Sequence, residues 1–269
     1  MRQILSFDCE QTPCAATLDI AASESGLLIV SGGNEIRAGA HRGMAQLSAD
    51  ICEKGHSVFR FDRRGIGDSA GDNGGFSESE SDLAAALEAF RRACPHLKKI
   101  IGFGNCDAAS ALLLHPPEGL SALVLGNIWV IEATDDLPPT AAIRAHYLER
   151  LKDPQAWAGL FTGAINIKKL ASGLLKLAKP QEPTTLSQQI GQGLAQFDGP
   201  VTILLAKRDA TALAFASAWK EAAFDHARAR PDIRLVSLDS ASHSFASADD
   251  HAMLVSTLLA ALDAETKAQ

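Results

Sequence analysis

Residues 98–114, KKIIGFGNCDAASALLL, decide the fold, because they read as a buried strand, a tight turn and a helix in direct succession. In the turn Gly104-Asn105-Cys106-Asp107-Ala108, small residues stand two positions before and two positions after a nucleophilic side chain. This pattern is typical of a nucleophile elbow, in which small flanking residues let the helix approach the strand. We therefore predict that Cys106 is a nucleophile.

Two other interpretations of this stretch compete with the elbow. A cysteine after a buried strand is often only a small apolar core residue. Gly102-x-Gly104 followed by Ala108 also loosely imitates a dinucleotide-binding fingerprint. Such a fingerprint normally lies on the first strand of its domain, with an acidic residue about twenty positions later. This stretch instead follows several predicted strands, which favours the nucleophile elbow.

Length and composition set the class of protein. The 269 residues, 46% of them hydrophobic, suit one large α/β domain or one domain with an inserted subdomain. The net charge of −7 argues against nucleic acid as a partner. The N-terminal residues lack a secretory signal pattern and no apolar run is long enough to span a membrane, so we expect a cytoplasmic protein without membrane insertion. The five cysteines are odd in number and form no CxxC pair, so we expect neither a disulfide framework nor a metal site.

Strands and helices alternate along the chain. Residues 2–8 and 14–20 alternate in polarity and predict an antiparallel pair at the sheet edge, with Cys9, Gln11 and Pro13 marking the turn. Continuous apolar runs predict strands that are buried on both faces. The further predicted strands are 26–30, 56–61, 122–125, 201–206 and 234–238, and the predicted helices span about 41–54, 80–94 and 249–263.

The pattern changes between residues 128 and 197, where helical periodicity continues without strands. We predict a helical cap over the site in this insertion, between core parts 1–127 and 198–269. Caps of this kind exclude water and shape a substrate pocket. Trp129 and the other aromatic side chains of the insertion either line an apolar cleft or pack the cap itself.

The glycine-rich loop after the strand at 26–30 is well placed to form an oxyanion hole. In a nucleophile-elbow architecture one amide comes from the residue after the nucleophile, here Asp107, and a second from a loop after an early strand. By position we favour the amide of Gly33, with Asn34 next. A plain strand-to-helix turn is the alternative. Arg37, His41 and Arg42 follow, and they either bind an anionic group of a substrate or are solvated or paired with Glu35 and Asp50.

The partners of Cys106 follow late in the chain. Asp209 comes directly after the strand at 201–206, and His243 lies in a small-residue loop after the last strand. The order of nucleophile, acid and base is the one that the elbow architecture requires. We predict that His243 accepts the Cys106 proton, or holds an ion pair with it, and that Asp209 orients the imidazole. Asp239 is the alternative acid.

Three stretches carry a resemblance to a known family: VSGGNEIRAGAHR at 30–42, FRFDRRGIGDSAGDNGGF at 59–76 and GNCDAASALLLHP at 104–116. With the Asp209 and His243 pair, they resemble the α/β-hydrolase superfamily, and more narrowly the exosortase A system-associated hydrolase 1 group. The resemblance implies an α/β-hydrolase fold: a mostly parallel central sheet flanked by helices, with a helical cap inserted after the strand that follows the nucleophile helix. The group implies a bacterial protein associated with export of sorted proteins and exopolysaccharide synthesis. Cys106 departs from the superfamily's usual serine and is similar to the nucleophile of dienelactone hydrolases.

Two classes of function follow from these residues. The first is a cysteine-dependent hydrolase of a small-molecule ester or thioester, or an acyltransferase that uses the same acyl-enzyme and no cofactor. The second is a non-catalytic binding or scaffold member of the fold, because fold alone does not establish function. The sequence leaves the oligomeric state open.

Overall fold

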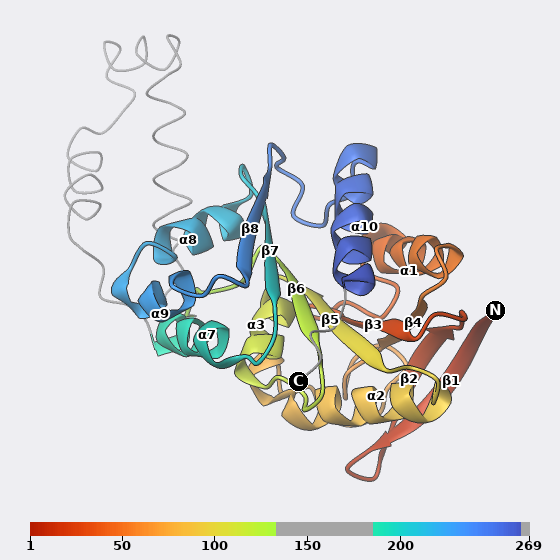
Figure 1. Ribbon diagram of the computed structural model, residues 1–269. Coiled ribbons are helices and arrows are strands. Elements are labelled where there is room, and N and C mark those ends of the chain that lie inside the picture. The colour runs from red at the N-terminus through yellow and green to blue at the C-terminus, as the bar shows by residue number, and fades with distance from the viewer. Residues whose placement is uncertain (133–184, 265–269) are drawn as a thin grey trace, which may run out of the picture.

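The computed structural model describes residues 1–132 and 185–264, which form an eight-stranded sheet in the order β1-β2-β4-β3-β5-β6-β7-β8 (Figure 1). All neighbouring strands are parallel except β1 with β2 and β2 with β4. The predicted antiparallel pair at the edge and the predicted parallel strands are therefore confirmed. The strands are β1 (Arg2–Cys9), β2 (Thr12–Asp19), β3 (Ser25–Val30), β4 (Ser57–Phe61), β5 (Lys99–Asn105), β6 (Ala122–Gly126), β7 (Val201–Ala206) and β8 (Ile233–Leu238).

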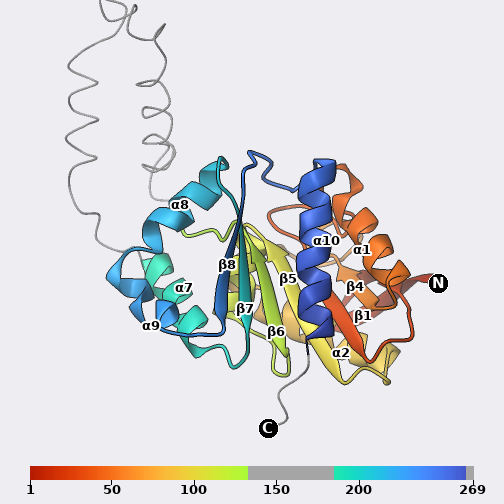
Figure 2. The same cartoon turned by 45° about the horizontal axis from the view of Figure 1, so that its top comes forward.

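Helices cover both faces of this sheet, because its central strands carry apolar side chains on each face (Figure 2). On one face, α1 (Gly43–Glu53) and α10 (Ala248–Asp263) pack with a core cluster around Ile29, Phe103 and Val124. On the other face, a second cluster around Leu28, Phe59 and Leu125 receives α2 (Glu80–Ala93), α3 (Asp107–Leu114), α7 (Thr185–Gln196), α8 (Ala210–Ala218) and α9 (Asp225–Arg228). No helix among the described residues is both long and apolar enough to cross a membrane.

Two local boundaries differ from the sequence prediction. The first hairpin turns on Glu10 and Gln11 alone, both with positive φ, so that Cys9 already pairs with Thr12 and the strands are longer than expected. The predicted helix at 41–54 begins only at Gly43. His41 and Arg42 have φ values of 51° and 62°, which end a short 3₁₀ turn, η1 (Ala40–Arg42), and interrupt the helical path.

The segment of residues 133–184, which holds most of the predicted cap, lies outside the described residues, so the cap stays a prediction. The two flanks of this segment are joined, because the Leu186 amide donates to Glu132 Oε1 at 2.8 Å. The described end of the range, α7, packs against α3 and α9, with Ile190 and Leu194 buried in the sheet's core. Arg230 holds the C-terminal end of α7 and the residues after it by donating to the carbonyls of Leu194, Phe197 and Gly199.

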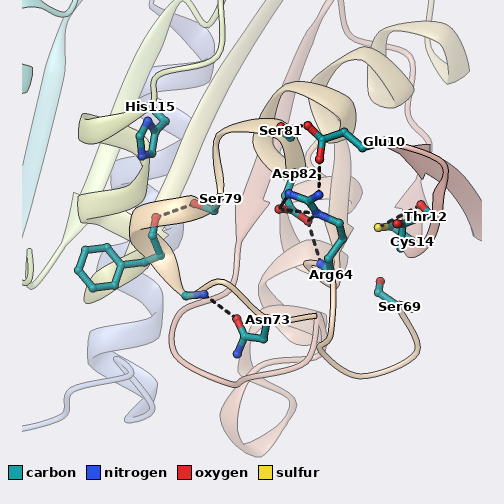
Figure 3. A network of polar contacts seen from close by, with 12 residues as sticks. Glu10, Thr12, Cys14, Arg64, Ser69, Asn73, Ser79, Ser81, Asp82 and His115 are labelled. Carbon is teal, nitrogen blue, oxygen red and sulfur yellow. Dashed lines mark hydrogen bonds and ion pairs between the residues drawn. The ribbon is translucent and has the colours of Figure 1, made fainter. Parts of the chain in front are cut away.

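A polar network holds the loop after β4 against the first hairpin (Figure 3). The guanidinium of Arg64 donates to Asp82 of α2 and to Glu10 of the hairpin turn, and Ser81 Oγ donates to Glu10 at 2.6 Å. Farther along the same loop, Ser79 caps the short 3₁₀ helix η2 (Phe76–Glu78) by donating to the Phe76 carbonyl at 2.8 Å. This bond holds η2 at the start of α2, and η2 lies next to α3.

The close approach of α3 to β5 depends on Gly104. A Cβ at this position would lie 2.7 Å from the carbonyl of Ala108 and 2.8 Å from the amide nitrogen of Ala109, which are backbone atoms of the helix. Helix and strand thus meet at a distance that only glycine permits, as the small-residue pattern predicted.

We expect Gly104→Ala to lower the free energy of unfolding by about 1–3 kcal/mol, because the added methyl group pushes the helix away from the strand. Gly43→Ala is the matched control, since a Cβ there meets nothing within 4 Å and the backbone is helical. Urea denaturation of the three proteins measures the difference. Equal stability of Gly104→Ala and Gly43→Ala would contradict this account of the packing.

Candidate active site

Cys106 lies at the sharp turn between β5 and α3, with φ 61° and ψ −127°. A non-glycine residue rarely adopts a positive φ, and the surrounding structure must hold it there. The amide of Cys106 donates to the Gly126 carbonyl at 2.9 Å, and its carbonyl accepts from the amides of Ala109 and Trp129 at 3.1 and 3.3 Å. These bonds to neighbouring elements fix the strained turn and leave the thiol partly exposed.

His243 and Asp209 come together through the register of β7 and β8. Ala206 pairs with Leu238 at the ends of the two strands, and the Arg208 amide donates to the Ser240 carbonyl at 2.8 Å, so the two loops run side by side. His243 Nδ1 lies 3.0 Å from Asp209 Oδ1. The second carboxylate oxygen of Asp209 accepts from the Ala212 amide at 3.0 Å and caps α8. Asp209 is therefore held in the orientation that faces the imidazole.

The surroundings of Asp209 and His243 stabilise the charged forms of both side chains. Burial alone would raise the pKa of Asp209, but hydrogen bonds from His243 and from the Ala212 amide outweigh it and leave the pKa below its ordinary value. Hydrogen bonds with Asp209 and then with Cys106 raise the pKa of His243 to about 10, against the opposing effect of burial. The His243 side chain is 42% exposed, so water screens part of this attraction. The arrangement favours an imidazolium between a carboxylate and a sulfur atom.

Two asparagines clamp the backbone of the histidine loop, and sequence reasoning assigned no role to either. Asn105 Nδ2 and Asn127 Nδ2 each donate to the His243 carbonyl at 3.0 Å. The fully buried Asn127 also accepts from the Ala206 amide at 2.9 Å. The signal in the sequence was a polar amide at the end of each of two neighbouring buried strands. The clamp connects the ends of β5, β6 and β7 to the loop that carries His243.

Both expected oxyanion donors line the same cavity as Cys106, but one of them is occupied. Asp107 is the first residue of α3, so its amide has no acceptor within the helix. The amide of Gly33 donates to the two carboxylate oxygens of Asp107 at 2.7 and 2.9 Å. Asn34 lies on the exposed side of the loop, where its Oδ1 accepts from Asn73 at 2.9 Å. Gly33 is thus the member of the loop whose amide points toward the elbow.

A cavity of about 590 Å³ opens over these residues, which is within the usual size range of small-molecule sites. Cys106, His243, Asp107 and Gly33 are among the residues that line it. The apolar part of the lining comes from the end of β3, from η1 and α1, from η2 and α3, and from both flanks of the segment 133–184. These apolar residues are Val30, Ala40, Met44, Phe76, Leu114, Trp129, Ile131 and Leu186.

The residues expected to bind substrate are divided by the structure. Trp129 lies in the cavity wall, where Ser110 Oγ holds its carbonyl at 2.6 Å. Arg37 is outside the cavity lining and pairs with Asp62 and, at 2.9 Å, with Asp68. His41 is exposed and is also outside the lining. Of the two interpretations of the basic residues, pairing therefore describes Arg37, although its partners are other carboxylates than those expected.

No group of three or more His, Cys, Asp or Glu side chains in residues 1–132 and 185–264 is arranged to hold a metal ion.

Known structures share this architecture. The esterase Pf2001 of Pyrococcus furiosus matches with a TM-score of 0.65 and 15% sequence identity, over 96% of this chain and 92% of that chain. The α/β hydrolase GrgF from Penicillium sp. sh18 matches with a TM-score of 0.64 and 16% identity, over 97% and 99% of the two chains. Est1E from Butyrivibrio proteoclasticus, solved with ferulic acid bound, matches with a TM-score of 0.63 and 13% identity, over 97% and 100%.

No protein-family model and no curated protein matches the sequence. The structural likeness nevertheless extends over nearly the whole length of each of these chains. The chain therefore has the α/β-hydrolase fold.

Proposed function

We propose that the protein hydrolyses a carboxylic ester or thioester of a small molecule, with Cys106 as the nucleophile, His243 as the acid and base, and Asp209 as the residue that orients His243. The observation that carries this proposal is the 3.0 Å contact of His243 with Asp209, beside a strained cysteine in the wall of a cavity. Structural neighbours named as esterases agree with it.

In the first half of the proposed reaction, the Cys106 sulfur attacks the acyl carbon and the carbonyl π electrons move to oxygen. The oxyanion accepts hydrogen bonds from the Asp107 amide and from the Gly33 amide. As the intermediate collapses, the bond to the leaving oxygen or sulfur breaks and the His243 imidazolium gives that atom its proton. The product is a thioacyl-enzyme and a free alcohol or thiol.

In the second half, neutral His243 takes a proton from a water molecule, whose oxygen attacks the thioester carbon. Collapse of the second tetrahedral intermediate breaks the carbon–sulfur bond and releases the carboxylic acid. The sulfur leaves as a thiolate beside the newly protonated imidazole, which regenerates the starting ion pair. Asp209 stabilises the imidazolium in both halves without itself being protonated.

The motifs at 30–42, 59–76 and 104–116 support the narrower part of the proposal, that this hydrolase is a bacterial protein associated with the exosortase and exopolysaccharide system. A capping segment within residues 128–197 belongs to the same proposal. If the thioacyl-enzyme passes its acyl group to an acceptor other than water, the protein is an acyltransferase. A panel of alcohols and thiols added to the assay distinguishes hydrolysis from acyl transfer.

Cys106→Ala removes the attacking atom, so we expect turnover of short-chain and medium-chain esters and thioesters to fall at least about a thousandfold. Cys52→Ala is the matched control, because Cys52 is also a partly exposed cysteine but lies outside the cavity lining. Initial rates with a chain-length series measure the effect. Full activity of Cys106→Ala would exclude the proposed nucleophile.

The proton on His243 gives a pH prediction. Its folded-state pKa is raised from 6.5 to about 10, so the stability that comes from the charged pair is complete below pH 6.5 and is lost as the pH rises toward 10. We expect the NMR chemical shift of the imidazole Cε1 proton to change with a midpoint far above pH 6.5. We expect Asp209→Asn to move that midpoint to lower pH. An imidazole that titrates near 6.5 in the wild type would contradict the ion pair.

We expect variants of the asparagine clamp to lose activity although Cys106 and His243 themselves are unchanged. Asn127→Ala removes one donor to the His243 carbonyl and leaves the Ala206 amide unpaired, so we expect kcat to fall by about tenfold to a hundredfold. Asn105→Ala also removes one donor to the His243 carbonyl but leaves the Ala206 amide paired with Asn127, so we expect a smaller loss. Steady-state kinetics and the NMR titration of His243 check both variants. A loss of thermal stability with unchanged kcat and unchanged His243 pKa would make the clamp purely structural.

A further inference from the structure

The loop after β3 forms a cradle around the carboxylate of Asp107. Both carboxylate oxygens accept from the Gly33 amide, at 2.7 and 2.9 Å. A Cβ on Gly32 would lie 2.5 Å from Asp107 Oδ1 and 2.9 Å from the Asn105 carbonyl, so only glycine leaves room for the carboxylate at this place. The position of this side chain is therefore built into the loop.

Arg63 is the third residue of the cradle, after Gly32 and Gly33. Its guanidinium is buried and donates through Nη2 to the Gly33 carbonyl at 2.6 Å, which fixes the turn that carries the Gly33 amide. The loop closes on itself as well, because the Glu35 amide donates to the Gly32 carbonyl at 3.0 Å. Burial lowers the pKa of Arg63, and the negative charge of Asp107 acts in the opposite direction. The cradle thus combines an oriented amide with a buried positive charge.

An amide oriented beside a positive charge is what a developing oxyanion needs, and here a carboxylate already fills the position. One N–H group cannot serve two anionic oxygens at full strength. A carboxylate that stays beside the elbow also repels the negative charge that forms on the substrate oxygen. Occupancy by Asp107 therefore opposes the reaction twice, by taking a donor and by adding charge of the wrong sign.

We propose that the Asp107 carboxylate occupies the second oxyanion position and restrains catalysis until it leaves the Gly33 amide. This inference rests on the proposed hydrolase function. Asp107 then has two opposed contributions: its backbone amide stabilises the oxyanion, and its side chain competes with it. The residue sets the rate of acyl transfer to Cys106 through the fraction of molecules in which the Gly33 amide is free.

The test compares the wild type with Asp107→Ala and Asp107→Asn, using p-nitrophenyl butyrate and a butyryl thioester. Asp107→Ala keeps the backbone amide and frees Gly33, so we expect kcat/KM to rise about tenfold or more. Asp107→Asn still accepts from Gly33 through its amide oxygen but carries no charge, so we expect a smaller rise. Asp249→Ala is the matched control, because it removes an exposed carboxylate from the first turn of α10, away from the cavity.

A second readout does not depend on turnover. The amide proton resonance of Gly33 reports its hydrogen bond, and we expect it to move upfield in Asp107→Ala and to stay in place in Asp249→Ala. An unchanged Gly33 resonance in Asp107→Ala overturns the inference, as does turnover at or below the wild-type rate in a variant that melts cooperatively. Turnover that survives addition of Cys106→Ala, or its absence from every protein, overturns the proposed function itself.

Discussion

The site depends on one contact, the approach of the α3 backbone to β5 across Gly104. This approach forces the chain to reverse within one residue, and Cys106 adopts a positive φ as a result. Strain of this kind costs on the order of 1–3 kcal/mol and persists only where neighbours hold it. Here the neighbours are Gly126 and Trp129, which bond the main chain of Cys106 from the adjoining strand and from the loop that follows it. Packing in the core therefore determines where the Cys106 side chain lies at the end of β5.

The other groups reach the same place because parallel strands end at one edge. Gly33 follows β3, Asp209 follows β7 and His243 follows β8. Asn105 at the end of β5 and Asn127 after β6 bind the backbone of the loop that carries His243. Ligand sites lie at this edge of open α/β sheets in general. In this chain the carboxylate of Asp107 faces the Gly33 amide at the same edge.

Much of the fold follows from the sequence, because apolar runs predict the buried parallel strands. The spacing of small residues around Cys106 predicts the elbow. The order of Cys106, Asp209 and His243 along strand ends likewise predicts that they lie near one another, and the structure brings them together. The sequence does not reveal the partners of individual polar groups. Arg37 pairs with Asp62 and Asp68 through a loop that no spacing rule locates, and the side chain of Asp107 turns back onto Gly33. Such contacts depend on three-dimensional proximity between segments about 25 to 75 residues apart.

The hydrogen bond between Leu186 and Glu132 has a consequence for how the chain tolerates change. It joins the two flanks of residues 133–184, and the guanidinium of Arg230 anchors the chain again just beyond α7. The ends of that segment are therefore brought together by the core, whatever the length of chain between them, and loop length adds to closure entropy only logarithmically. Recombination can therefore exchange this segment as a module, while the register of the sheet strands stays as it is.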